Sequence, residues 1–201
     1  MYPAFFDHVK IFECADPLAS ILGVNNDGAL RYSYEDCVKL AGHSCPTVAG
    51  AYLMVTKGVQ ALYGDERPRR GEVKVTLKGR LGEGTVGVMA MVATLLTGAS
   101  GEGGFHGLGG KFDRRGLLAF DPSLSYDMLF ERCDTPQAVG VSYNPSCVPA
   151  DPQMFSMLTQ LLINEDDHEL KNRFGLMWQE RVKKILIDYC DDERVIKLTL
   201  R

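Results

Sequence analysis

The chain has 201 residues, of which 45% are hydrophobic and 24% charged, and its formal net charge is -4. This length can bury one good core, so we expect one domain with appendages rather than two domains. The slightly acidic balance argues against a nucleic-acid partner, and no uncharged apolar run has the character of a membrane span.

The first predicted elements are two short helices with a strand between them. Asp16 has the chemistry of a helix cap and Pro17 suits the first helical turn, so a helix is predicted from there to Gly23. Residues 29–32 follow a turn sequence and predict a short strand. Ser33, followed by two acidic residues, predicts the start of the second helix.

A third helix is predicted over residues 47–63, with Pro46 in its first turn. Its apolar residues recur at helical spacing. Gly50 stands inside this helix, where glycine costs roughly 1 kcal/mol against alanine. Two explanations stay open: a ligand approaches the backbone near Cys45, or the helix packs tightly against a neighbouring element.

The centre of the chain predicts one strand, one helix and three further strands. Residues 72–79 alternate charged and apolar side chains, the pattern of a strand with one solvated face. Residues 85–96 are apolar and rich in Met and Ala, which favours a buried helix. Residues 116–120, 128–132 and 138–143 are expected to form an antiparallel meander.

The loop over residues 98–110 carries seven glycines in thirteen positions. Such density indicates repeated positive φ angles or close approach to another group. The loop is no Walker A motif, because Phe112 follows Lys111. An anion-binding nest closed by Lys111 and an ordinary tightly turned loop both remain open. As a further hypothesis, the loop closes over Cys45.

Residues 152–163 and 166–190 predict two C-terminal helices, the second with a wide apolar stripe that the core or a partner chain must cover. Strands followed by helices indicate an α+β protein. We expect an antiparallel or mixed sheet core with packed helices over residues 1–148. A helical C-terminal extension over residues 149–201 is expected to pack on that core.

His43 and Cys45 lie two residues apart at the start of the third helix. Unpaired backbone N–H groups and the helix dipole favour a thiolate at this position. An imidazole and a thiolate together suit a soft divalent metal or a His-assisted nucleophile. The plain alternative is a buried cysteine and a capping histidine. The six cysteines contain no C-x-x-C pair, which favours a reducing, cytoplasmic setting.

Residues 40–52, LAGHSCPTVAGAY, resemble the G-H-x-C-P-x-x-x-x-G signature of the FmdE family, which takes its name from a component of formylmethanofuran dehydrogenase. The strings TGAS at 97–100 and GGKF at 109–112 resemble that family's second block. The resemblance covers about residues 10–145. It implies a dimeric α+β core and a metal site with His43 and Cys45 as ligands, and it places Lys111 in the same cleft.

Two departures from the family pattern bear on the metal. Many members carry a Cys and an Asp where this chain has Val88 and Met91, neither of which binds a metal. The C-terminal zinc finger of some members is replaced here by the predicted helices. A complete zinc site then needs other ligands, and His106 and Glu102 in the glycine-rich loop are the nearest chemical candidates, along with water or substrate.

Three functions are therefore weighed. The first is a metal-binding protein of one-carbon or molybdopterin-enzyme metabolism, holding zinc or another transition metal at His43 and Cys45, with bound water as nucleophile if it is catalytic. The second is a metal-free enzyme with Cys45 as nucleophile. The third is a non-catalytic accessory subunit or carrier of a small anionic or pterin-like ligand. We also expect a homodimer formed through the core.

Overall fold

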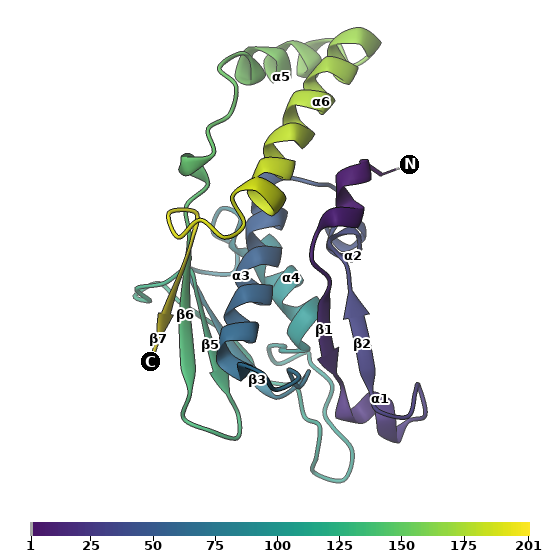
Figure 1. Ribbon diagram of the computed structural model, residues 1–201, viewed down its shortest axis with the longest axis vertical. Coiled ribbons are helices and arrows are strands. Elements are labelled where there is room, and N and C mark those ends of the chain that lie inside the picture. Colours follow the sequence, from purple (N-terminus) through teal and green to yellow (C-terminus); the bar gives the residue numbers. More distant parts are fainter. Residues whose placement is uncertain (1) are drawn as a thin grey trace.

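Two sheets lie on either side of a helical layer in the computed structural model, which describes residues 2–201 (Figure 1). The larger sheet has the strand order β4-β3-β5-β6-β7, and the smaller pairs β1 with β2. The helical layer contains α3 and α4, and α3 is the longest helix of the described residues. The expected α+β class is confirmed.

The strands have the following bounds: β1 Phe12–Ala15, β2 Ala29–Tyr32, β3 Val73–Lys78, β4 Leu118–Asp121, β5 Met128–Arg132, β6 Ala138–Tyr143 and β7 Ile196–Leu200. The helices are α1 Pro17–Ile21, α2 Tyr34–Ala41, α3 Pro46–Tyr63, α4 Val86–Thr97, α5 Gln153–Ile163 and α6 His168–Lys183. Short 3-10 turns span Ala4–His8 (η1) and Pro145–Cys147 (η2), and a π-helical segment, η3 (Lys184–Asp188), continues α6.

The predicted helix starts are confirmed by their capping contacts. Asp16 accepts from the N–H groups of Leu18 and Ala19 at the start of α1. Ser33 and Asp36 form a reciprocal capping box at the start of α2. Local chemistry fixes these boundaries, because each cap satisfies N–H groups that the helix itself leaves unpaired.

The predicted meander is wrong in its first strand. β4 pairs in parallel with β3, whereas β5 pairs antiparallel with the other edge of β3. The reason is α4, which carries the chain from β3 across one face of the sheet, so that β4 begins at the same end as β3. β5 and β6 pair antiparallel as expected.

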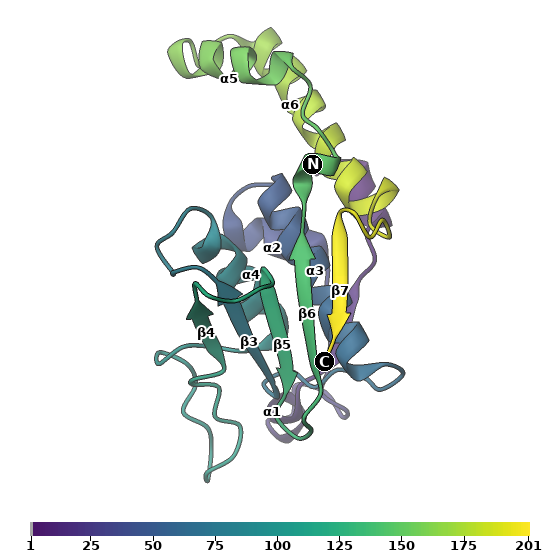
Figure 2. The same cartoon turned by 90° about the vertical axis from the view of Figure 1, so that its left-hand side faces the viewer.

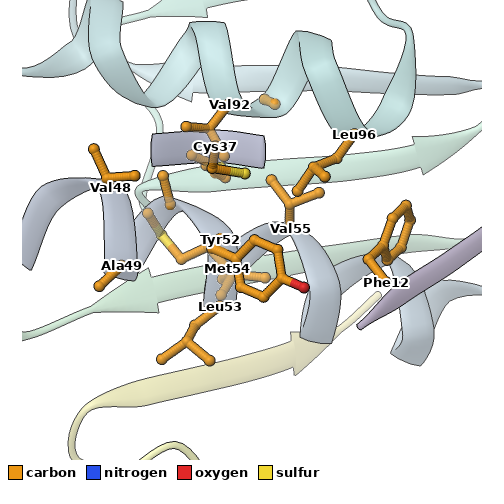
Figure 3. Packing of buried hydrophobic residues seen from close by; sticks show 14 of the residues in the cluster. Phe12, Cys37, Val48, Ala49, Tyr52, Leu53, Met54, Val55, Val92 and Leu96 are labelled. Carbon is orange, nitrogen blue, oxygen red and sulfur yellow. The ribbon is translucent and has the colours of Figure 1, made fainter. Parts of the chain in front are cut away.

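Helix α3 is the centre of the core. Figure 3 shows Val48, Tyr52 and Val55 of this helix near side chains of α2, α4 and β1, and all three are buried. Gly50 and Gly58 face the sheet, where a Cβ would lie 2.2 Å from the Tyr143 ring and 2.6 Å from the Phe130 ring. The second explanation for Gly50, tight packing against a neighbouring element, is therefore confirmed.

The larger sheet buries one face and leaves the other open to solvent. Val73, Val75 and Leu77 of β3 are buried, whereas Lys74 and Lys78 between and after them are exposed. In Figure 2 the viewer looks onto the outer face, with α2, α3 and α4 behind the strands. The predicted solvated face of this strand is confirmed.

The C-terminal region differs from the extension expected over residues 149–201. Its helices α5 and α6 form a hairpin that projects from the body (Figures 1 and 2), but the chain then returns as β7. β7 pairs antiparallel with β6 and completes the larger sheet. The region is therefore not wholly helical, and its last strand belongs to the core. Among the described residues, no helix combines the length and apolar character that crossing a membrane requires.

Candidate functional site

The segment from His43 to Cys45 joins two helices and is shaped by both. Gly42 ends α2 with a left-handed φ of 77°. Cys45 is the N-cap of α3, and its sulfur accepts from the Val48 N–H at 3.4 Å. The Cys45 side chain is buried, whereas His43 is exposed. A thiol and an imidazole thus stand at a helix N-terminus, as the sequence predicts.

The imidazole of His43 has a defined orientation. Its Nδ1 lies 3.0 Å from the Ala41 carbonyl oxygen. A carbonyl oxygen can only accept, so the contact places a proton on Nδ1 and leaves the Nε2 lone pair of the neutral ring free. Metal-binding histidines are commonly oriented by this kind of backbone contact.

Helix α6 holds the segment from outside. The Trp178 indole N–H donates to the Ser44 carbonyl at 2.8 Å, and the Gln179 amide donates to the same oxygen at 3.3 Å. The Ser44 hydroxyl donates to Gln179 Oε1 at 2.9 Å. The projecting hairpin therefore positions the site. Sequence reasoning missed this role, although the single tryptophan on the apolar stripe was a signal.

Two buried tyrosines support the segment from the inside. Tyr34 donates to the Ser44 hydroxyl at 3.0 Å, since the proton of that hydroxyl is given to Gln179. Tyr143 donates to the Pro46 carbonyl at 2.8 Å. Burial raises the pKa of both phenols well above the ordinary value. Both therefore act as neutral donors at physiological pH.

The expected metal ligands do not form a complete set within one chain. Among the described residues, no three His, Cys, Asp or Glu side chains come together where an ion could sit. His106 and Glu102 were expected near Cys45, but their loop lies at the other end of α3 (Figure 1). That helix has 18 residues, a length of about 27 Å. The expectation of a ligand set drawn from the glycine-rich loop is wrong.

The same distance separates Lys111 from Cys45. Lys111 lines a cavity with Arg69 and Arg114, beside the segment that follows the C-terminal end of α3. Cys45 stands at the opposite, N-terminal end of that helix. The expectations that Lys111 lines the cleft of Cys45 and that the loop closes over it are therefore wrong. The loop is instead anchored to Arg114 and Gly71, through Ser100 and Thr97 respectively.

Nothing in the geometry activates Cys45 as a nucleophile through His43. Within the described part of the chain, no hydrogen bond joins the two side chains: the thiol contacts the Val48 N–H and the imidazole contacts a carbonyl. A His-assisted nucleophile requires that hydrogen bond. The arrangement suits two independent donor atoms better than a Cys–His dyad.

Comparison with known proteins adds little to this geometry. No protein-family model matches the chain, and no curated protein matches it significantly. The solved structure of an FmdE-like protein of tungsten formylmethanofuran dehydrogenase, from Syntrophus aciditrophicus, is similar, with 16% identity and a TM-score of 0.43 over 85% of this chain and 72% of that one. This is a weak likeness to an FmdE-like fold and assigns no function.

Proposed function

We propose that this protein binds one transition-metal ion, zinc first among the candidates, through His43 Nε2 and Cys45 Sγ. The observation that carries the proposal is the His43 contact with the Ala41 carbonyl, which leaves Nε2 as a free donor atom. Imidazole nitrogen and thiolate sulfur are ligands that zinc prefers.

The remaining coordination positions are filled from outside the chain in this proposal. One chain supplies two donors, whereas zinc sites in proteins generally use three or four protein ligands. Water, a small ligand or a second copy of the chain would supply the others. A bound zinc ion would act as a Lewis acid toward such a ligand. The protein's own part is to orient the imidazole through Ala41 and to hold the segment through Trp178 and Gln179.

The biological setting is part of the same proposal. The G-H-x-C-P signature at residues 42–46 supports a place in one-carbon or molybdopterin-enzyme metabolism, as a member of the FmdE family. The six cysteines are all unpaired, which supports a reducing, cytoplasmic location. We assign no reaction to the site.

Zinc titration followed by tryptophan fluorescence tests the proposal. Trp178 is the single tryptophan, and its indole N–H bonds to Ser44 between the two ligands, so its emission reports on the site. We expect a saturable change at one zinc per binding site, weakened about tenfold or more by His43→Ala and by Cys45→Ser. Cys133→Ser and His168→Ala, which alter an exposed cysteine and an exposed histidine elsewhere, are the matched controls.

Equal binding by all five proteins would contradict the assignment of His43 and Cys45. If the protein binds no metal while iodoacetamide modifies Cys45 rapidly, the second function, a metal-free cysteine enzyme, is favoured instead.

A second candidate function, that of an accessory subunit, is favoured by one surface. The outer side of the α5–α6 hairpin exposes large apolar side chains: Phe155 (81%), Leu162 (70%), Ile163 (83%) and Leu176 (68%). The inner side is covered, because Met154 and Met157 of α5 are buried in the hairpin and Val182 of α6 is buried in the core. An apolar patch on a projecting hairpin is typical of a protein interface.

The expected homodimer is proposed to use this hairpin rather than the core. Light scattering of the intact protein should then give about twice the chain mass of 22.2 kDa. The double substitution Leu162→Glu and Ile163→Glu should give the monomer mass, whereas Leu81→Glu, at an apolar residue 60% exposed elsewhere, should not. A monomeric intact protein would contradict the dimer and leave another protein as the hairpin's partner.

A further inference from the structure

A second cavity lies at the end of α3 that is remote from Cys45. It measures about 490 Å³ and is lined by residues 69–72 and by Lys111, Phe112 and Arg114 of the glycine-rich loop. Cavities of several hundred Å³ are of the size that holds a metabolite. The functional site described above uses none of these residues.

Positive charge predominates around this cavity. Asp16 is 4% exposed and accepts from two guanidinium groups: Arg114 Nη2 reaches both carboxylate oxygens at 2.7 Å, and Arg70 Nη1 reaches one at 3.0 Å. Burial by itself would raise the pKa of Asp16, but its hydrogen bonds to Arg114 and Arg70 outweigh burial and hold that pKa below the ordinary range. One carboxylate therefore faces two permanent cations.

The surrounding charges do not neutralise the excess. Arg69 pairs with Glu72 at 3.1 Å, and Asp113 is occupied by Arg115. In the part of the chain that the structure describes, the Lys111 ammonium forms no ion pair. Five cations thus stand against three carboxylates, a local excess of two positive charges on a chain whose net charge is -4.

Arg114 also keeps donor capacity in reserve. Its Nη2 is taken by Asp16, but its Nε–H is buried and has no acceptor among the described residues. Gly71, another lining residue, stands beside this group: a Cβ there would lie 3.2 Å from Nε. Buried donors are nearly always paired, so an unpaired arginine N–H on a cavity wall indicates that an acceptor comes from outside the chain.

The glycine-rich loop is built to hold Lys111 and Phe112 at this wall. Leu108 and Lys111 exchange both backbone hydrogen bonds, at 2.8 and 3.0 Å, around Gly109 and Gly110, whose φ angles are 56° and 76°. Positive φ at both central residues is the requirement of a type I′ hairpin turn. A Cβ at Gly107 would lie 2.2 Å from the Lys111 carbonyl oxygen, so this hairpin needs its glycine.

Phe112 adds a second mark of a built site. It is the one residue other than glycine with positive φ (62°) in the described part of the chain. Such backbone strain in a non-glycine residue persists where the surroundings hold it, and it occurs often at ligand-binding positions. The strained turn brings the Phe112 side chain to the same cavity as the three cations.

We propose that this cavity binds a phosphate group of a small metabolite. Arginine and lysine side chains recognise phosphate oxygens, arginine by paired N–H donors and lysine as a point charge. Arg69, Lys111 and Arg114 supply these donors, and Phe112 and Pro17 supply apolar contacts for the remainder of the molecule. The site is independent of the metal site, since the two lie at opposite ends of α3.

Calorimetric titration with inorganic phosphate and pyrophosphate tests this site, using the full chain in low salt without divalent cations. We expect saturable binding of both, tighter for pyrophosphate, and a loss of at least fivefold in affinity in Lys111→Ala and in Arg69→Ala. Lys197→Ala removes the same charge from exposed strand β7 and should leave binding unchanged. His43→Ala should also leave binding unchanged, which separates this proposal from the metal site.

Two further results would overturn the proposal. Absence of saturable binding at millimolar pyrophosphate would remove the site, as would an equal loss of affinity in Lys197→Ala, which would indicate unspecific attraction. Acetate is the third titrant, and tighter binding of acetate than of phosphate would overturn the phosphate assignment in favour of a carboxylate.

Discussion

Replacing Gly50 by alanine tests whether the sheet must approach α3 this closely. The added methyl would lie 2.2 to 2.5 Å from three ring atoms of Tyr143, closer than side chains tolerate. Tyr143 has little freedom to yield, because its hydroxyl donates to the Pro46 carbonyl and its backbone N–H donates to Asp127. The substitution therefore forces the ring, and with it β6, away from α3.

The expected cost is set by two opposing effects. Overpacking a core costs about 1 to 3 kcal/mol, and losing the Tyr143 hydrogen bond adds about 1 kcal/mol. Alanine returns up to about 1 kcal/mol through its higher helix propensity. We expect a net loss of about 2 kcal/mol in the free energy of unfolding. For a chain of this length that corresponds to a decrease of about 4 to 8 °C in melting temperature.

Gly175→Ala in α6 is the matched control, because nothing lies within 4 Å of the added methyl. There the helix propensity acts alone, and we expect a gain of about 0.5 to 1 kcal/mol. Urea denaturation of both variants measures the two free energies. A Gly50→Ala protein as stable as the unaltered chain, or more stable, would refute the account of how the sheet packs on α3.

Two other substitutions test the ion cluster and the last strand. Asp16→Asn leaves two buried guanidinium groups without their carboxylate, and we expect a loss of about 3 kcal/mol at pH 7. Because the pKa of Asp16 is lowered from its ordinary value of 3.8, its contribution is present above that pH and lost as pH falls through the folded value. The two proteins should therefore converge in stability at lower pH, and a constant difference would contradict this. In β7, Ile196→Ala should cost about 3 kcal/mol, since Ile196 is 4% exposed. Leu200→Ala, at a residue 73% exposed, should change stability by less than about 0.5 kcal/mol, and equal effects would exclude β7 from the core.

The elements could be predicted where local chemistry decides them. Asp16, Ser33 and Pro46 mark helix starts because each satisfies or avoids an unpaired N–H group within its own turn. The pairing of β4 with β3 could not be predicted in this way, because it depends on the direction in which α4 crosses the sheet. Strand β7 carries a period-two alternation from Ile196 to Leu200 that indicates a strand, and sequence reasoning missed it.

The candidate site shows the same division. The placement of His43 and Cys45 at the mouth of α3 is confirmed, since it follows from Pro46 and the helix that it begins. The expected proximity of Lys111 to Cys45 failed, because two motifs that follow each other in a signature can lie at opposite ends of a helix about 27 Å long. The contacts of Trp178 and Gln179 with Ser44 depend on tertiary packing.

X-ray absorption spectroscopy at the zinc edge tests the central claim most directly, because it reports the atoms bound to the ion. For the zinc-loaded protein we predict sulfur at about 2.3 Å and nitrogen at about 2.0 Å in the first coordination shell. The sulfur signal should disappear in Cys45→Ser and persist in the control Cys133→Ser. A shell of oxygen and nitrogen alone in the unaltered protein, or a sulfur signal that survives Cys45→Ser, would contradict the proposed metal site.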